Sequence, residues 1–288
     1  MMASERQPAV AGRFYPGTSA ACEHALDELV QGLESRAAIG AIVPHAGWVY
    51  SGRTAARGIA GVTDAGPETV VIFGAVHVLD MNDASVFSEG SWATPVGSVA
   101  IDEELGRRVA QSDLVIDDPA AHRSEHSIEV EVPIIQRLMG DVAILPVMVR
   151  PGPRAAEVGV ACAEAARALG RRVVFVGSTD LTHYGPAFGF EPHGQGEEGI
   201  RWAKEVNDRR FITLIEALDA DGVVPEAAAN YNACGAGAVA ATIAAARAAG
   251  AQVYTELEHI TSADRDLAEG IPPLNSVGYE AGIFEQAS

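Results

Sequence analysis

The chain has 288 residues, and 48% of them are hydrophobic, which is enough to bury a sizeable core in one large domain or two small ones. Its 20 basic residues stand against 39 acidic residues, so the formal net charge at pH 7 is −19. Nucleic acids and anionic membranes both attract basic surfaces. The charge therefore argues against both as partners, while a local cleft can still accept a small molecule of either sign.

The cysteines indicate a reducing environment. Cys22, Cys162 and Cys234 are odd in number and far apart, without a Cys-x-x-Cys pair, so a disulfide framework is not expected. The first residues lack the basic and apolar regions of a signal peptide. The most apolar long tract, residues 236–251, is interrupted by Arg247 and is too short to cross a bilayer. We expect a cytoplasmic protein.

Hydrophobic periodicity predicts alternating strands and helices. After an extended segment over residues 1–17, the expected strands cover residues 39–43, 70–73, 114–116, 142–149, 172–176, 252–260 and 276–284, with short extended pieces over residues 84–101. The expected helices cover residues 19–33, 53–60 (capped by Ser51), 102–110, 153–169 and 200–218, and a helix of small residues ends near residue 249. Residues 185–199 are rich in glycine and proline, which indicates a loop or lid.

This pattern predicts one α/β domain over residues 1–288, since no internal repeat, low-complexity tract or linker interrupts it. The segment before Pro133 is ambiguous. Alternation over part of it suits a strand, whereas the spacing of Ile128 and Val132 with later apolar residues favours a helix that Pro133 bends. We predict the helix.

Histidines follow three of the expected strands. His45 comes after residues 39–43, directly behind Pro44, which ends that strand. His77 follows the strand over residues 70–73, and His183 follows the strand over residues 172–176. Open α/β sheets bind their ligands beyond the carboxyl ends of the strands. The three placements together predict one crevice.

Neutral imidazole is the commonest metal ligand in proteins, and thiolate or carboxylate completes most sites. The candidate ligands in this chain are His45, His77, His183, Asp180 and Cys234. Their spacing matches neither a zinc finger nor a His-Glu-x-x-His helix, so distant parts of the chain would have to hold the metal. The alternative is that each histidine hydrogen-bonds within its own loop and that Cys234 is a packing residue at the start of a helix.

Glu125, His126 and Glu129 would share one face of the expected helix. Carboxylates there can orient the histidines that bind a metal. The alternative is that they form a solvated helix face. No Gly-x-Gly-x-x-Gly, Walker or Gly-x-Ser-x-Gly sequence occurs, so nothing supports nucleotide binding or a serine hydrolase.

Five short motifs resemble those of the Memo family, whose bacterial and archaeal members are called AmmeMemoRadiSam system protein B. The likeness runs in order from residue 11 to the C-terminal strands. The motifs are AGRFYP at residues 11–16, PHAGWVYSG at residues 44–52, EHSIEV at residues 125–130, STDLTHYG at residues 178–185 and NACG at residues 232–235.

The resemblance implies a fold related to class III extradiol dioxygenases, with a mixed, mostly parallel central sheet flanked by helices. Those enzymes use non-haem iron(II). Carried over, His45 and His77 are metal ligands and His183 is an acid/base residue that Asp180 orients. Cys234 stands in place of the dioxygenase glutamate, and a thiolate suits copper or zinc as well as iron.

We also expect six side chains around the ligands or in a substrate pocket, namely Glu125, His126, Glu129, Trp48, Tyr50 and Tyr184. One segment departs from the family, because Gly74-Ala75-Val76 precedes His77 where a polar neighbour is usual. The change affects what surrounds His77 but keeps the imidazole.

We expect an iron-dependent oxidoreductase that acts on a small organic substrate. The alternatives are a non-catalytic protein that binds metal or peptide, and a zinc-dependent hydrolase. The family name further implies a functional association with radical SAM proteins.

Overall fold

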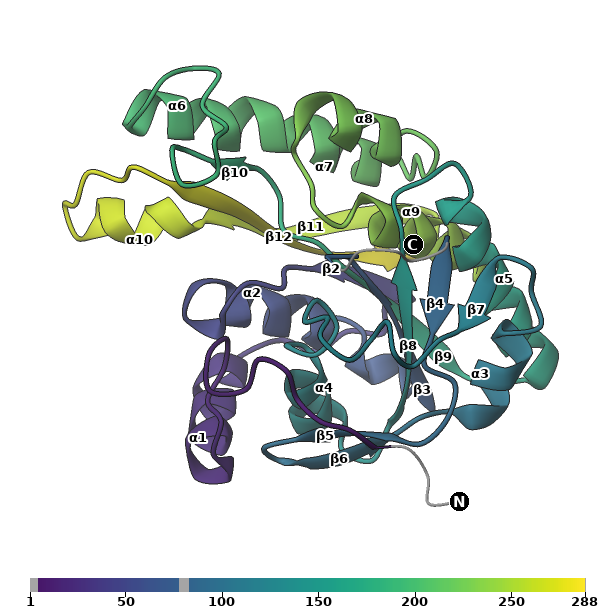
Figure 1. Cartoon of the computed structure of the whole chain (residues 1–288). Helices are drawn as coiled ribbons and strands as arrows, with labels where there is room; N and C mark the ends of the chain where they lie inside the picture. Colours follow the sequence, from purple (N-terminus) through teal and green to yellow (C-terminus); the bar gives the residue numbers. More distant parts are fainter. Residues whose placement is uncertain (1–4, 78–82, 288) are drawn as a thin grey trace.

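The computed structural model describes residues 5–77 and 83–287, so residues 1–4 of the expected extended N-terminal segment lie outside the described residues. Within these ranges the chain forms a large mixed sheet flanked by helices, as the α/β prediction requires (Figure 1). The strands are β1 (Glu5–Arg6), β2 (Gly40–Val43), β3 (Thr69–Gly74), β4 (Ala84–Val86), β5 (Ser91–Thr94), β6 (Gly97–Ala100), β7 (Val115–Asp117), β8 (Ala143–Val149), β9 (Val173–Ser178), β10 (His183–Tyr184), β11 (Val253–Thr261) and β12 (Ser276–Glu285).

The main sheet has parallel strands at its centre and antiparallel strands beside them. In the described part of the chain its order is β10-β12-β2-β9-β3-β8-β4-β7, and β11 pairs with β12. Strands β2, β9, β3 and β8 are parallel neighbours, and Val71 of β3 aligns with Phe175 of β9 and Leu145 of β8. Both faces of these four strands are buried, which explains their continuous apolar sequences.

The helices cover the sheet and extend beyond it (Figure 1). They are α1 (Ser19–Val30), α2 (Trp48–Ala60), α3 (Glu103–Val109), α4 (Val132–Met139), α5 (Ala155–Leu169), α6 (Glu197–Trp202), α7 (Arg209–Glu216), α8 (Val223–Asn230), α9 (Ala236–Ala248) and α10 (Ser262–Ala268), with a 3-10 turn η1 (Thr63–Ala65) and a π-helical segment η2 (Ala203–Asp208). Helix α2 packs on β2 and β12, and α9 packs on β2, β3, β8 and β9.

Small residues let α5 approach α9 closely. Helix α9 is largely alanine, and most of its residues are buried. A side chain at Gly159 of α5 would place its first carbon 1.9 Å from the carbonyl oxygen of Ala241. The close packing of α5 on α9 therefore depends on Gly159 in α5 and on the alanines of α9.

Two predicted helix starts were wrong. Helix α2 begins at Trp48, with Gly47 at its N-cap, so Ser51 lies inside the helix rather than capping it. Trp48 is anchored there because its backbone N–H donates to the carbonyl of Phe14. The loop expected to end at residue 199 ends earlier, because α6 begins at Glu197.

The predicted helix through Glu125 and Glu129 was also wrong. Residues 127–131 form turns, and α4 begins only at Val132. Pro133 lies in the first turn of α4, where its missing N–H costs no helical hydrogen bond. Proline therefore starts this helix instead of bending it.

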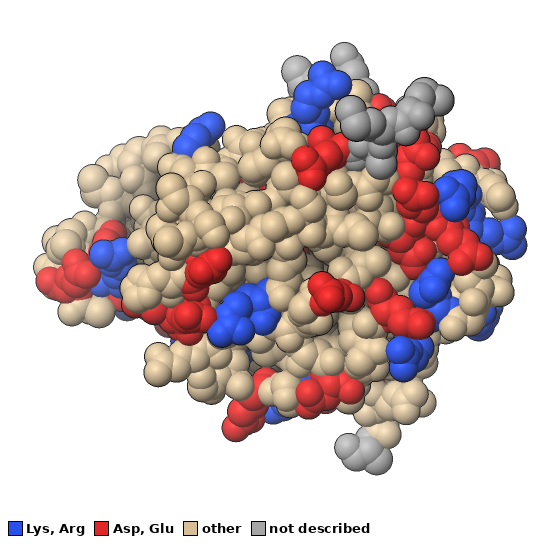
Figure 2. Space-filling model, turned by 90° about the horizontal axis from the view of Figure 1, so that it is seen from below, with Lys and Arg blue, Asp and Glu red and all other residues tan. Residues whose placement is uncertain are grey.

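Charged groups are mixed on the surface. Figure 2 shows that Lys and Arg lie among Asp and Glu on the face seen from below. None of the described helices has both the length and the apolar character needed to span a bilayer.

Strand β12 carries a buried acid that makes stability depend on pH. Glu280 is 0% exposed and accepts a hydrogen bond from the hydroxyl of Tyr254 on β11. Burial raises the pKa of Glu280 from 4.5 to about 8. Between these two pH values the folded protein keeps a proton that the unfolded chain has released, so the free energy of unfolding falls as the pH rises.

Glu280→Gln should remove this loss, because the amide keeps an acceptor for Tyr254 and cannot ionise. We expect the variant to exceed the wild type in free energy of unfolding by a few kcal/mol at pH 8.5, since each unit of pKa shift is worth about 1.4 kcal/mol. The gain should shrink towards pH 5. Denaturant titrations at both pH values measure it, and a gain that is the same at both would contradict the assignment.

Candidate metal centre

The candidate site lies where three parallel strands end. Strands β2, β9 and β3 are neighbours in the sheet, so their carboxyl ends meet at one edge. His45 follows β2 by two residues, His77 follows β3 by three, and Asp180 follows β9 by two. The spacing of short loops behind parallel strands therefore brings distant parts of the sequence together.

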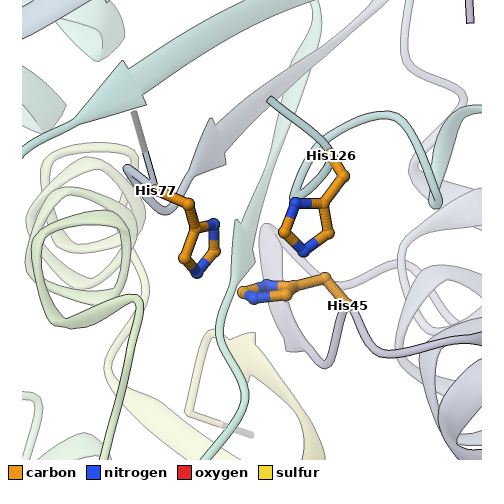
Figure 3. A group of neighbouring side chains, drawn as sticks. All are labelled: His45, His77 and His126. Carbon is orange, nitrogen blue, oxygen red and sulfur yellow. The ribbon is translucent and has the colours of Figure 1, made fainter. Parts of the chain in front are cut away.

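Three imidazoles form the centre of this site. One nitrogen each of His45, His77 and His126 lies within 4.8 Å of the others, and the three rings converge, with His45 edge-on to the other two (Figure 3). The ring centroids are 5.3 Å apart for His45 and His77, 5.6 Å for His45 and His126, and 4.7 Å for His77 and His126. His45 is buried, whereas His77 and His126 are reached by solvent.

Hydrogen bonds fix which nitrogen of His45 carries the proton. Its Nδ1 lies 2.7 Å from the hydroxyl oxygen of Ser178, and that hydroxyl donates to the carbonyl of Ser127 at 2.7 Å. Because Ser178 has a single proton, it must accept from Nδ1–H of His45. The lone pair of Nε2 is then free for a metal.

Glu125 orients the other two histidines. Its Oε2 accepts the backbone N–H of His77 at 2.7 Å, and its Oε1 lies 3.0 Å from Nδ1 of His77. The same Oε1 accepts the backbone N–H groups of His126 and Ser127, and it lies 3.4 Å from Nδ1 of His126. A carboxylate behind an imidazole is the usual support for a metal ligand.

Electrostatics favours the neutral forms of His45 and His126, the protonated form of His77 and an ionised Glu125. Burial, and next the neighbouring imidazoles, lower the pKa of His45, and burial lowers the pKa of His126. Burial also lowers the pKa of His77, but the hydrogen bond and charge of Glu125 outweigh it, so that the pKa is raised. Burial opposes the charge of Glu125, yet His77 and backbone N–H groups hold its pKa well below the ordinary value.

Cys234 and Asp180 lie beside His45. The thiol sulfur is 3.3 Å from Nε2 of His45, and it also receives the backbone N–H of Asp180 at 3.3 Å. Burial raises the pKa of the Cys234 thiol, so it can donate to Nε2 when no metal is bound. Asp180 accepts the backbone N–H of His45 at 2.8 Å, and burial raises its pKa to about 7.

His183 and Cys234 border a cleft of about 560 Å³. Phe188 lies against the ring of His183, with the centroids 5.1 Å apart. Burial, and next His77, lower the pKa of His183. His183 is therefore a neutral imidazole that faces a cleft next to the three histidines. The other lining residues are Phe188, Gly189, Phe190, Ala227, Tyr231 and Ala233.

Glu129 serves a different part of the fold. Its carboxylate accepts the backbone N–H groups of Ala9 and Val10 and the hydroxyl of Tyr15, and it pairs with Arg6 at 2.8 Å. It therefore holds the N-terminal segment. Although Glu129 is four residues from Glu125, it makes none of its hydrogen bonds to the three histidines.

The aromatic residues of the matching motifs are divided between core and surface. Trp48 is buried, stacks on Tyr15 and donates to the carbonyl of Val130 at 2.8 Å. Tyr50 is 53% exposed. Tyr184 is buried and donates to the carbonyl of Gly194, so it supports the loop after β10 rather than the three histidines.

The structure adds one residue to the expected ligand group. His126 was expected beside the ligands, and its nitrogen instead lies among them. Its adjacency to Glu125 was the available signal, because a carboxylate next to a histidine is typical of a metal site. Cys234 touches the group through His45, and its role as a ligand stays a prediction.

The residues fit a transition metal. Imidazole nitrogens stand about 2.0–2.1 Å from a zinc ion, so two of them in a tetrahedral site are about 3.4 Å apart. The three nitrogens lie within 4.8 Å of one another, so binding one ion would draw them closer together. His45 and His77 both use Nδ1 for hydrogen bonds to the protein, which leaves Nε2 for a metal, and the Cys234 sulfur lies 3.3 Å from Nε2 of His45.

The fold and the site define an α/β protein with a histidine cluster at the carboxyl edge of its sheet. The family model described as "Memo-like protein" matches residues 6–283. A "MEMO1 family protein" of Thermococcus onnurineus is 37% identical over 294 residues, covering 98% of this chain and 99% of the relative. A "MEMO1 family protein" of Methanococcoides burtonii is 38% identical over 291 residues, covering 97% of this chain and 100% of the relative. The chain belongs to the Memo family.

A solved structure, the uncharacterized protein JW3007 from Escherichia coli K12, aligns with a TM-score of 0.49 and 14% identity. It covers 84% of this chain and 98% of its own length. This likeness is too weak to support a conclusion.

Glu125→Gln tests the support of the histidines. An amide cannot accept the same hydrogen bonds with a full negative charge, so we expect metal affinity to fall by roughly 10- to 100-fold. Glu129→Gln is the matched control, since Glu129 is equally buried in the same segment and binds the N-terminal segment. It should lower thermal stability with little change in zinc affinity. Equal losses of affinity in both variants would contradict the separate roles.

Proposed function

We propose that this Memo-family protein binds one transition metal ion through His45, His77 and His126, and that the metal serves oxidation of a small organic substrate. The observation that carries the proposal is the convergence of three imidazole nitrogens within 4.8 Å of one another. Iron(II) is the metal we favour, with copper or zinc as alternatives. All three accept imidazole ligands, and Cys234 adds a soft donor next to His45.

The cleft beside His183 is the proposed substrate site. Its volume of about 560 Å³ suits a small molecule. A redox-capable metal would supply the activation of dioxygen or substrate, and the chain would supply orientation and proton transfer. His183 is suited to the proton transfer because it is neutral at physiological pH and lines the cleft.

Metal selectivity tests the ligand assignment. Imidazole and thiolate donors should bind iron(II), copper or zinc and should bind magnesium weakly, because magnesium prefers oxygen ligands. We expect a large excess of magnesium to leave bound zinc in place at pH 7, and His45→Ala or His126→Ala to lower zinc occupancy sharply. Equilibrium dialysis with elemental analysis measures both. Displacement of zinc by magnesium would refute the assignment.

His183→Ala separates an enzyme from a binding protein. The variant should keep its metal and lose oxygen-consuming activity by roughly 10²- to 10⁴-fold, the usual contribution of a positioned proton-transfer group. His24→Ala is the control, since His24 is 78% exposed on α1.

Three other outcomes point elsewhere. Loss of metal from His183→Ala would make His183 a ligand. Unchanged oxygen uptake would remove the proton-transfer role and favour a metal- or peptide-binding protein. Zinc-dependent hydrolysis without oxygen uptake would favour the hydrolase.

A further inference from the structure

Tyr231 stands at a position where glycine is the usual residue. Helix α8 ends at Asn230, and Tyr231 follows it in the left-handed conformation, with a φ of 52° and a ψ of 38°. Its backbone N–H donates to the carbonyl of Ala227 and so closes the last turn of the helix. Glycine normally fills this position, because a side chain makes the left-handed conformation unfavourable. The backbone therefore gives no reason for a tyrosine here.

Burial gives no reason for it either. Tyr231 is 69% exposed, more than any other large hydrophobic residue in the described part of the chain. Its ring lies against Phe190, with the centroids 5.6 Å apart, and it lines the cleft that His183 and Cys234 border. Residues held in unfavourable backbone conformations cluster at sites that bind ligands. The exposed ring is therefore a candidate contact for the substrate.

A network of polar side chains fixes the backbone on both sides of Tyr231. Asn207 of η2 donates from Nδ2 to the carbonyl of Asn230 at 3.0 Å, and the side-chain amide of Asn232 donates to the carbonyl of Asn207 at 2.9 Å. Glu226 accepts hydrogen bonds from the side chains of Asn230 and Asn232 at 2.8 and 3.0 Å. Asn207 and Asn232 are both 0% exposed. These bonds offset the cost of the left-handed conformation.

The same π-helical segment holds the loop that carries His183. Asn207 Nδ2 donates to the hydroxyl oxygen of Thr182 at 3.1 Å, and Asp208 accepts the backbone N–H of Thr182 at 3.0 Å. Thr182 is 1% exposed and directly precedes His183. π-Helical turns are rare and often occur at functional sites. Here the turn gives His183 and Tyr231, which line one cleft, a common support.

The cleft suits an uncharged apolar group. Three of its lining side chains are aromatic, namely Phe188, Phe190 and Tyr231, and no Asp, Glu, Lys or Arg is among the described residues that line it. A charged group without a partner is costly to bury. An apolar group, by contrast, gains free energy from contact with aromatic rings.

We propose that Tyr231 is a substrate-contacting residue that selects an uncharged, apolar part of a small molecule, and that Asn207 is the positioning residue that holds Tyr231 and His183 in one cleft. This inference rests on the proposed substrate site. It accounts for a tyrosine at a glycine position, because the ring contributes to binding what its backbone conformation costs in stability.

Tyr231→Gly separates a role in binding from a role in stability. The variant loses the ring and relieves the backbone, so we expect its melting temperature to equal or exceed that of the wild type. The probe is phenylnaphthylamine, an uncharged dye whose fluorescence increases in apolar surroundings. We expect Tyr231→Gly to bind the dye about tenfold more weakly, because an aromatic contact is lost, and Tyr231→Phe to bind it as tightly as the wild type.

Leu218→Gly is the matched control. Leu218 is the other non-glycine residue with a positive φ in the described part of the chain, and it is not among the residues that line the cleft. Its replacement changes a left-handed position in the same way, so dye affinity should stay at the wild-type value. An equal loss of dye binding in both variants would overturn the role of the ring. A lower melting temperature of Tyr231→Gly would also overturn it, because the ring would then be a structural residue.

Cysteine labelling shows where the dye binds. Cys234 borders the cleft, whereas Cys22 and Cys162 are 0% exposed. Bound dye should slow the alkylation of Cys234 by iodoacetamide, which mass spectrometry measures. The sulfonated counterpart of the dye, anilinonaphthalene sulfonate, has the same rings and a negative charge, and it should bind more weakly. Equal or tighter binding of the sulfonate would overturn the selection of an uncharged group.

Asn207→Asp tests the positioning role, because the carboxylate keeps the shape of the side chain and cannot donate. We expect weaker dye binding, and much less additional weakening when Tyr231→Gly is combined with it. If Asn207→Asp does not fold, Glu226→Ala takes its place, since Glu226 holds Asn230 and Asn232 as well. Additive losses, or no loss, would overturn the positioning role.

The remaining outcomes separate this inference from the proposed function. Unchanged dye affinity in Tyr231→Gly, with Cys234 protected, would overturn the inference alone. A dye that does not bind, or that binds without protecting Cys234, would overturn the proposed substrate cleft and this inference with it. Zinc occupancy is measured on the same samples, and its absence would overturn the proposed metal centre without affecting the role of Tyr231.

Discussion

One buried carboxylate holds the candidate centre together. Glu125 is 3% exposed, and it accepts hydrogen bonds from the loop behind β3 and from its own segment before α4. Several N–H donors keep such a carboxylate ionised inside a protein. Through it, His77 and His126 share one anchor although they are separated by 49 positions in the sequence. The remaining histidine, His45, is held independently by Ser178 and Asp180.

The charges of the site are arranged for a cation. Three imidazoles converge on one point, and Glu125 supplies a permanent negative charge behind them. Asp180 has a pKa of about 7 because of burial, so it can ionise near neutral pH with little cost. Membership of the Memo family accounts for the fold, but a fold hosts many chemistries. The case for a metal therefore rests on these particular residues.

Much of the architecture could be predicted from the sequence, because buried parallel strands leave continuous apolar runs. The runs that became β2, β3 and β9 placed His45 and His77 behind neighbouring strands, and the resemblance to the Memo family supplied the same two positions. The segment from Glu125 to Glu131 could not be predicted this way. Its apolar spacing suits a helix, whereas long-range hydrogen bonds to Glu125 and Glu129 hold it in turns.

Glu129 shows why spacing alone was insufficient. It lies four residues from Glu125 in the same motif, yet its partners are Arg6, Val10 and Tyr15, more than a hundred residues away. The N-terminal segment runs past Glu129, and this path makes Glu129 an anchor for that segment instead of a partner of the histidines. Hydrophobic periodicity carries no information about that path. The position of His126 among the candidate ligands depends on the same path, because its neighbours Glu125 and Glu129 are both held by long-range hydrogen bonds.

X-ray absorption spectroscopy of the zinc- or iron-loaded protein tests the central claim most directly. The account predicts imidazole scattering from three nitrogen ligands, at about 2.0–2.1 Å for zinc, and its reduction when His126 is replaced by alanine. A sulfur at about 2.3 Å would add Cys234 to the ligands. A coordination sphere made only of oxygen, unchanged in the His126 variant, would contradict the account.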